Sequence, residues 1–289
     1  MNILVPPREE QDQIVRYLDW QIKNLNDLIL VSKRKIEELS KLRCSVIDRG
    51  ILYGFQNAEK KESHITWLGK IPCLWEILPL KRICKVNASI SKQLQRLKNS
   101  DYVTFLPIEN ITTNGEIDIS EKRKLAEVRT GFSSFAKGDV VIAKITPCFE
   151  NGKGACLDVL DTNIGFGTTE LINLRPTDKI ISKYLYYITM TRPFRKLGEI
   201  VMTGSAGQKR VPVSFVKNFV LGIPEIAEQK IIVRIIEDKL SAINDLISKE
   251  LKFIQYLDDF KRCLISDVVT GQINVRHIKV PDDFQSESK

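Results

Sequence analysis

The chain is poor in the residues that build common catalytic and metal sites. It contains only two histidines, His64 and His277, among 289 residues. Its six cysteines are scattered, and no two stand at Cys-x-x-Cys spacing. Zinc sites need clustered cysteines and histidines, and nucleophilic triads need a histidine base. These shortages argue against a metal site and against a Ser/His/Asp or Cys/His catalytic centre.

Long apolar runs and common enzyme motifs are missing as well. No stretch approaches the ~18 apolar residues that a membrane-spanning helix needs, and the first residues do not have the pattern of a signal peptide. There is no Gly-x-x-x-x-Gly-Lys-[Ser/Thr] phosphate loop, dinucleotide-binding glycine fingerprint, Gly-x-Ser-x-Gly elbow or Asp/Asn-Pro-Pro-Tyr motif of amino-methyltransferases. We therefore expect a non-catalytic protein, with the reduced cysteines typical of the cytoplasm.

Two segments near opposite ends of the chain repeat each other at a constant offset. The first identities are Pro6, Glu10, Gln11, Ile14, Val15 and Arg16, which recur as Pro224, Glu228, Gln229, Ile232, Val233 and Arg234. In both copies apolar or small residues recur every three or four positions, with an average near the coiled-coil period of about 3.5. Ser32 and Glu250 occupy equivalent positions in this pattern.

Each copy predicts a long helix of roughly 40 residues, which is about 60 Å. Proline and acidic residues stand where each helix begins, and glycines at 50, 54 and 271 stand where it ends. An ordinary pair of amphipathic core helices is the alternative interpretation. The length of the pattern and its presence twice favour a coiled coil.

The segment between the helices has a different character. Short apolar stretches at 103–106, 140–143 and 170–174 are separated by turn residues, which indicates β-strands, and residues 181–197 have a helical pattern. We expect an α+β fold in which two long helices flank one mixed, mostly β domain. The expected boundaries are 1–54 and 223–274 for the helical regions, 55–66 for a linker, 67–222 for the central domain and 275–289 for a tail.

Positive charge is concentrated in the central domain. Residues 67–222 contain 23 basic and 14 acidic side chains, whereas the segments 1–66 and 223–289 are nearly neutral. A basic domain between neutral helices indicates a polyanionic partner, with DNA or RNA the first candidate. A generally basic protein surface is the alternative on charge alone.

Three loop-like stretches of the central domain, at 144–154, 165–169 and 202–212, combine cations, hydroxyls or amides with glycine. Glycine permits close approach of the backbone to a ligand. Lysine and serine can hold phosphates, whereas glutamine and arginine can reach base edges. For any one stretch a solvated turn is the alternative. The candidate DNA-binding residues are Lys81, Arg82, Lys92, Lys144, Thr146, Lys153, Thr168, Ser205, Gln208, Lys209 and Arg210.

Several motifs and their order point to one known family. The helices open with [Ile/Val]-Pro-x-x-x-Glu-Gln at 5–11 and 223–229, and Trp-Leu-Gly-x-Ile-Pro-x-x-Trp-Glu stands at 67–76. The second helix ends in the sequence Lys-Arg-Cys-Leu-Ile-Ser-Asp-Val-Val-Thr-Gly-Gln-Ile at 261–273. Together these resemble the specificity subunit of type I restriction-modification systems. The likeness covers nearly the whole chain, up to about Pro281.

The resemblance implies a non-catalytic subunit that recognises double-stranded DNA. Family members carry two target recognition domains, each reading one half of a bipartite site, and two helical regions that pack as an antiparallel coiled coil. The helices dock methyltransferase subunits, which methylate adenine N6, and a motor-nuclease subunit adds translocation and cleavage. This chain would hold no cofactor, because S-adenosylmethionine, ATP and Mg²⁺ are expected in the partner subunits.

The chain departs from the family pattern because only one domain accompanies the two helices. It would therefore be a C-terminal or half-subunit form that reads one half-site. A truncated or alternative-start product, a cassette of a recombining locus and a half-subunit that forms a homodimer all fit. The alternative function is a protein-interaction scaffold, or a cassette product without productive DNA binding.

Overall fold

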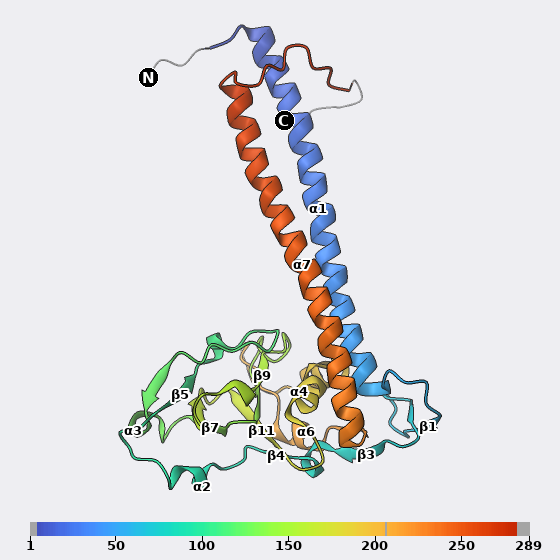
Figure 1. Ribbon diagram of the computed structural model, residues 1–289, viewed down its shortest axis with the longest axis vertical. Coiled ribbons are helices and arrows are strands. Elements are labelled where there is room, and N and C mark those ends of the chain that lie inside the picture. The colour runs from blue at the N-terminus through green and yellow to red at the C-terminus, as the bar shows by residue number, and fades with distance from the viewer. Residues whose placement is uncertain (1–4, 206, 282–289) are drawn as a thin grey trace. The chain divides into compact units, whose positions relative to one another are not determined.

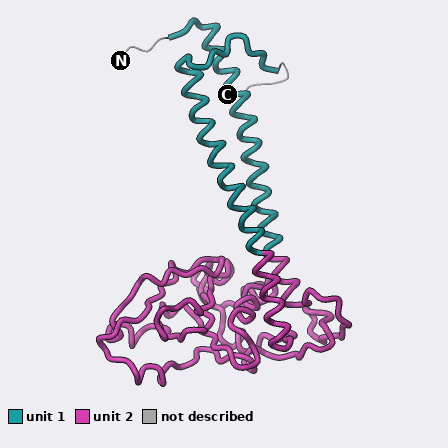
Figure 2. Tube along the Cα trace, in the orientation of Figure 1, with its two compact units in different colours: residues 1–43, 240–289 teal, residues 44–239 magenta. Residues whose placement is uncertain are grey.

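The computed structural model describes residues 5–205 and 207–281 (Figure 1). A 46-residue helix, α1 (Arg8–Tyr53), comes first in the element order, and a 44-residue helix, α7 (Ile226–Val269), comes last. The strands and the shorter helices lie between them in the sequence. The fold is α+β with two long flanking helices, as the sequence predicts. The chain divides into two compact units, residues 1–43 with 240–289 and residues 44–239 (Figure 2).

The described elements between the long helices all belong to the second unit. The α-helices are α2 (Ser91–Leu94), α3 (Leu125–Val128), α4 (Ser182–Met190), α5 (Arg192–Ile200) and α6 (Val213–Asn218). The strands are β1 (Lys60–Glu62), β2 (Lys70–Pro72), β3 (Glu76–Pro79), β4 (Cys84–Val86), β5 (Tyr102–Leu106), β6 (Lys122–Lys124), β7 (Ser133–Ala136), β8 (Val140–Ala143), β9 (Gly154–Cys156), β10 (Ile164–Gly167), β11 (Leu171–Pro176) and β12 (Val220–Ile223).

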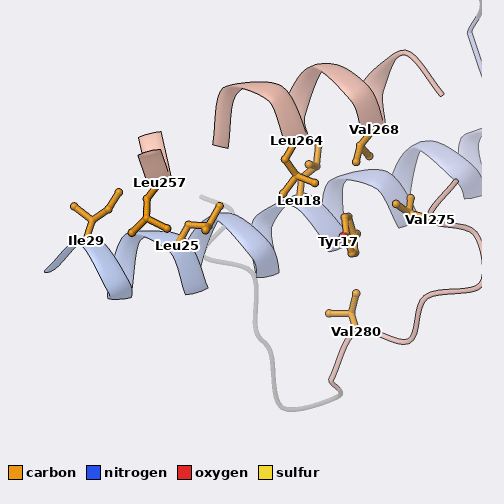
Figure 3. Close-up of a cluster of buried hydrophobic side chains, with 9 residues drawn as sticks. All are labelled: Tyr17, Leu18, Leu25, Ile29, Leu257, Leu264, Val268, Val275 and Val280. Atoms are coloured by element: carbon orange, nitrogen blue, oxygen red, sulfur yellow. The ribbon is translucent and has the colours of Figure 1, made fainter. Parts of the chain in front are cut away.

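In the first unit, α1 and α7 pack as an antiparallel pair. Lys35 forms an ion pair with Glu250, whereas Asn26 accepts a hydrogen bond from Lys261. Moving toward the start of α1 therefore moves toward the end of α7. The apolar seam between them is buried and includes side chains from both helices (Figure 3), namely Tyr17, Leu18, Leu25, Ile29, Leu257, Leu264 and Val268.

One polar layer interrupts this seam, at the positions that the repeat makes equivalent. Ser32 is only 4% exposed, and Glu250 is its counterpart in the second copy. Glu250 accepts hydrogen bonds from Lys35 and Ser32, which lower the pKa of its carboxyl, the lysine having the larger effect. A single polar layer within an apolar seam penalises shifted pairings, because the polar groups would then face apolar neighbours. Ser32 and Glu250 therefore help to fix the register of the helix pair.

The segment after α7 is packed against the first helix. Val275 and Val280 belong to the same buried cluster as Tyr17 (Figure 3). The side-chain amide of Gln13 donates hydrogen bonds to the carbonyls of Val275 and Ile278, at 3.0 and 2.8 Å. The described part of the segment that we expected as a tail is therefore ordered on the helix pair.

The second unit is built on two four-stranded sheets. One has the order β6-β5-β10-β7, with β10 parallel to β5, and the other is the antiparallel sheet β4-β11-β8-β9. Leu106 and Phe135 of the first sheet share a buried cluster with Val141 and Leu171 of the second. Phe105 belongs to a separate buried cluster, since successive side chains of a strand point to opposite faces. The first sheet is therefore covered on both faces.

Two segments differ from the sequence prediction. The segment 55–66, which we expected as a linker, contains β1, and Lys61 of this strand pairs with Ile71 of β2. The single helix expected at 181–197 is two helices, because the backbone is extended at Thr191. Pro193 explains the break, since its ring would collide with a carbonyl of the preceding turn in a continuous helix.

Each copy of the internal repeat has a glutamine near the start of its long helix, and the two glutamines form one equivalent hydrogen bond. Gln229 is fully buried, and its side-chain amide donates to the carbonyls of Pro224 and Lys179 at 2.9 and 2.8 Å. Its side-chain oxygen accepts from the backbone amide of Ile181 at 3.0 Å. In the first copy, Gln11 donates to the carbonyl of Pro6 at 2.8 Å, which repeats one of these bonds. Gln229 additionally anchors the segment 179–181 on α7.

Candidate DNA-binding interface

The three polar stretches that the sequence singles out meet at one edge of the second unit. β8 and β11 are antiparallel neighbours, so the end of β8 lies beside the start of β11. The backbone amide of Lys144 donates to the carbonyl of Glu170 at 2.9 Å. The amide of Thr146 donates to the carbonyl of Lys209 at 3.0 Å. We call the segments 144–149 and 167–170, together with the described residues 203–205 and 207–210, the three-loop surface.

An ion pair joins two of these loops. The guanidinium of Arg210 donates two hydrogen bonds to the carboxylate of Glu170, Nη2 to Oε1 at 2.8 Å and Nε to Oε2 at 3.0 Å. The hydrogen bond from Arg210 holds the pKa of Glu170 below its usual value. The arginine side chain remains 43% exposed. Such a bidentate pair fixes the orientation of both side chains. In this conformation Arg210 ties its own loop to the turn between β10 and β11.

Three exposed polar side chains of the three-loop surface lie on one turn. Ser205, Gln208 and Lys209 are exposed. The turn requires Gly204, whose φ is +136° and whose added Cβ would lie 2.5 Å from the carbonyl oxygen of Gln208. The turn therefore presents a hydroxyl, an amide and an ammonium group to solvent.

Two threonines of the surface, Thr146 and Thr168, are more enclosed. The hydroxyl oxygen of Thr168 accepts a hydrogen bond from the amide of Glu170 at 3.3 Å. The hydroxyl of Thr146 lies 3.9 Å from the sulfur of Met202. Both threonines are half-buried. Their hydroxyls therefore contribute more to loop geometry than Ser205 does.

A small polar cavity of about 190 Å³ lies beside the three-loop surface. Lys144, Thr169 and Asn173 are among the residues that line it. The side-chain amide nitrogen of Asn173 donates to the carbonyl of Ser134 at 2.9 Å. Its side-chain oxygen is buried and has no hydrogen-bond partner among the described residues. The cavity thus has room for a water molecule or another small donor group.

The remaining candidate residues lie outside this surface or are engaged elsewhere. Lys81 donates to the side chain of Asn218 at 2.9 Å, and the adjacent Arg82 is exposed. The ammonium of Lys153 donates to the carbonyl of Ile108 at 3.1 Å. Lys92 lies on α2. The structure thus brings together one subset of the predicted residues, which is Lys144, Thr146, Thr168, Ser205, Gln208, Lys209 and Arg210.

The family of the chain follows from comparison with known proteins. Residues 72–256 match the family model described as the type I restriction modification DNA specificity domain. The chain belongs to this family. This assignment agrees with the prediction of a non-catalytic recognition subunit. All the candidate residues, from Lys81 to Arg210, lie within the matched range.

Proteins similar in sequence to this chain are named as specificity subunits of type I restriction enzymes. The chain is 36% identical over 206 residues to the type I restriction enzyme EcoAI specificity subunit of Escherichia coli, a match that covers 70% of this chain and 34% of the relative. It is 38% identical over 167 residues to the EcoEI specificity subunit of the same organism, covering 57% and 27%. The matches thus span only about a third of these relatives.

Longer but weaker matches cover almost the whole chain. The MjaVIII specificity subunit of Methanocaldococcus jannaschii is 25% identical over 290 residues, covering 96% of this chain and 63% of the relative. A chain from a structure of a type I restriction-modification system superposes with a TM-score of 0.67 at 14% identity, covering 94% of this chain and 62% of that one. The HsdS subunit from Thermoanaerobacter tengcongensis gives a TM-score of 0.51 at 14% identity, covering 94% and 60%. At this identity the structures establish the shared fold.

Glu170 is not among the DNA-binding residues that the sequence predicts. The residue stands 40 positions before its partner Arg210. No local pattern joins them, because their contact depends on how strands β8 and β11 pair. The feature of the sequence that could have indicated Glu170 is the presence of a carboxylate in a basic segment rich in loops.

The described residues contain no group of three or more His, Cys, Asp or Glu side chains placed to hold a metal ion. Burial raises the pKa of the Cys84 and Cys156 thiols to about 12, so both remain protonated near neutral pH. No helix in the part of the chain that the structure describes is long and apolar enough to cross a membrane.

Proposed function

We propose that this chain reads one half of a bipartite DNA site for a type I restriction-modification complex in the cytoplasm. The observation that carries the proposal is the convergence of three polar loops inside the matched specificity domain. Backbone hydrogen bonds link these loops, and the Arg210–Glu170 pair clamps two of them. Such an arrangement fixes the relative positions of groups that must match a DNA sequence.

In the proposed recognition, cations contact phosphates and neutral polar groups contact bases. Lys144 and Lys209 would hold phosphates and set the register on the duplex. Gln208 and Ser205 would reach base edges in the major groove, where each base pair presents a distinct set of donors and acceptors. Arg210 would act chiefly by positioning the loop. The other cations remain candidates for phosphate contacts from other elements, namely Lys81, Arg82, Lys92 and Lys153.

The helix pair is proposed to dock the methyltransferase subunit. In the first unit, several large apolar side chains are exposed, including Leu28, Val31, Leu42, Phe253, Tyr256 and Phe260. Exposed apolar groups of this number on a pair of packed helices favour a surface that another protein covers. That partner would bind S-adenosylmethionine and methylate an adenine extruded from the duplex. A motor-nuclease subunit using ATP and Mg²⁺ would complete the complex.

A homodimer is the proposed route to a complete bipartite reader. The repeat gives α1 the same opening as α7, including the Gln11–Pro6 hydrogen bond that matches Gln229–Pro224. In α7 this glutamine also anchors residues 179–181. The equivalent end of α1 is therefore suited to a recognition domain of a second copy. An interaction scaffold without productive DNA binding is the alternative function.

The proposal predicts salt-dependent binding to duplex DNA that depends on the three-loop surface. We expect the double variant Lys144→Gln/Lys209→Gln to bind about ten-fold or more weakly, because two charge-assisted contacts to phosphates are lost. The variant Lys60→Gln/Lys61→Gln on β1 removes the same charge elsewhere and serves as the control. Affinities are measured by fluorescence anisotropy with a labelled duplex. Equal losses in both variants, or no binding by the wild-type chain, would contradict the proposal.

A further inference from the structure

A second basic site lies in the recognition unit, away from the three-loop surface. It is a cavity of about 530 Å³ with Lys92, Arg96 and Lys137 among its lining residues. Lys92 belongs to α2, Arg96 follows one helical turn later, and Lys137 stands in the turn between β7 and β8. Lys137 is distant from the other two cations in the sequence, so the fold gathers them.

The cavity is positive and lacks compensating acids. Among the described residues that line it, none is an aspartate or glutamate. Lys92, Arg96 and Lys137 also take part in none of the ion pairs that the described residues of this unit form. Three cations around one cavity repel one another, so an anion bound there would gain from all three.

The walls and floor also suit a phosphate ester. Gln93 and Asn163 also line the cavity, and their side-chain amides supply further donors. The backbone amide of Lys137 donates to the carbonyl of Asn163 at 3.0 Å, which fixes the two segments relative to each other. Buried Ile164 and Ala136 form an apolar floor. Anionic oxygens would face the cations, and the apolar part of an ester would face this floor.

We propose that this cavity binds a phosphodiester group of the duplex that the three-loop surface reads. The inference rests on the proposed DNA-recognition function. Strand β10 connects the two sites, since Ile164 at its start lines the cavity and Thr168 after its end belongs to the three-loop surface. Four residues of strand span about 13 Å. This is close to the ~12 Å width of the major groove, so one duplex could contact both sites across that groove.

The test is the salt dependence of DNA binding by the whole chain. Each lost phosphate contact reduces the slope of log affinity against log salt by about 0.9. We expect Lys92→Gln/Lys137→Gln to reduce this slope by about 0.9, the value for the one phosphate that the cavity holds, and to weaken binding equally on all sequences. The control Lys60→Gln/Lys61→Gln is expected to keep the wild-type slope. All four side chains are exposed, so thermal melts should show that the variants remain folded.

The outcomes separate this inference from the proposed function. If the wild-type chain binds DNA and the Lys92/Lys137 variant keeps the wild-type slope, the cavity does not bind the duplex, and the proposed DNA recognition by the three-loop surface still stands. Equal slope changes in the control variant would also overturn it. If the wild-type chain binds no duplex, both proposals fail. A final arm titrates inorganic phosphate and follows the backbone amides of Lys137 and Asn163 by NMR. Binding of phosphate without any slope change in DNA binding would assign the cavity to a free anion instead.

Discussion

At the scale of single residues, the Arg210–Glu170 pair changes what the arginine is expected to do. The sequence suggests a side chain that reaches a base edge. In the structure, two of its donors are directed at Glu170. An arginine held in this way keeps other donors exposed, but its position depends on the carboxylate. We therefore expect Arg210 to act on DNA mainly through the loop that it holds.

A double-mutant cycle tests this positioning role. We expect Arg210→Ala to weaken binding to the preferred sequence by about 1–3 kcal/mol. In a Glu170→Ala background the same change should cost much less, because the interaction that positions the loop is already absent. Binding is measured on the preferred duplex and on an unrelated one. An undiminished cost in both backgrounds would mean that Arg210 contacts DNA directly. An equal loss on both duplexes, with a shallower salt slope, would identify that contact as a phosphate.

Many of the candidate residues could be predicted from the sequence, but the groups that bind their side chains in the folded protein could not. The three polar stretches were identifiable by composition, since cations, hydroxyls, amides and glycine are enriched in them. Their convergence required the pairing of β8 with β11, which no short pattern encodes. Lys153 illustrates the limit, because its type and loop suggested a free cation while its ammonium donates to the carbonyl of Ile108.

At the scale of elements, the internal repeat has a physical meaning in its two glutamines. Both copies share the hydrogen bond to a proline carbonyl five residues earlier. Of the two, Gln229 in the second copy is fully buried and also bonded to the segment 179–181. The same sequence signature thus has a capping role in one copy and an anchoring role as well in the other.

The two copies provide a matched pair of variants. Gln229→Ala should lower the free energy of unfolding of its unit by about 2–4 kcal/mol, because buried backbone groups lose their partners. Gln11→Ala should cost under about 1 kcal/mol, since this half-buried side chain makes one described hydrogen bond. Urea unfolding followed by tryptophan fluorescence gives both values. Similar losses for the two variants would refute the anchoring role of Gln229.

The long helices and several strands were predictable because their periodicities extend over many residues. α1 ends at Tyr53, directly before Gly54 with φ of +69°, where the sequence placed the helix end. Strands β5, β8 and β11 also match predicted stretches. The parallel pairing of β5 with β10 was not predictable, because four other strands and the helix α3 separate the two along the chain. The break at Thr191 could have been anticipated from Pro193, which rarely continues a helix.

At the scale of the whole molecule, family membership and the charge distribution agree. The match to the specificity domain covers nearly all of the basic segment 67–222, and the segments on either side of that basic segment are nearly neutral. The first unit presents apolar side chains suited to a protein partner, whereas the second presents polar loops and a basic cavity suited to DNA. This division fits the proposed function, in which the chain would direct an enzyme complex to its DNA site without performing the chemistry.

The most direct test of DNA recognition is selection from randomised duplex DNA at near-physiological salt, with the chain co-purified with the proposed methyltransferase partner. We expect an enriched motif of a few base pairs, which one recognition domain reads. A palindromic pair of such motifs at fixed spacing would show in addition that two copies assemble. No enrichment by an intact complex would contradict DNA recognition by this chain and favour the scaffold.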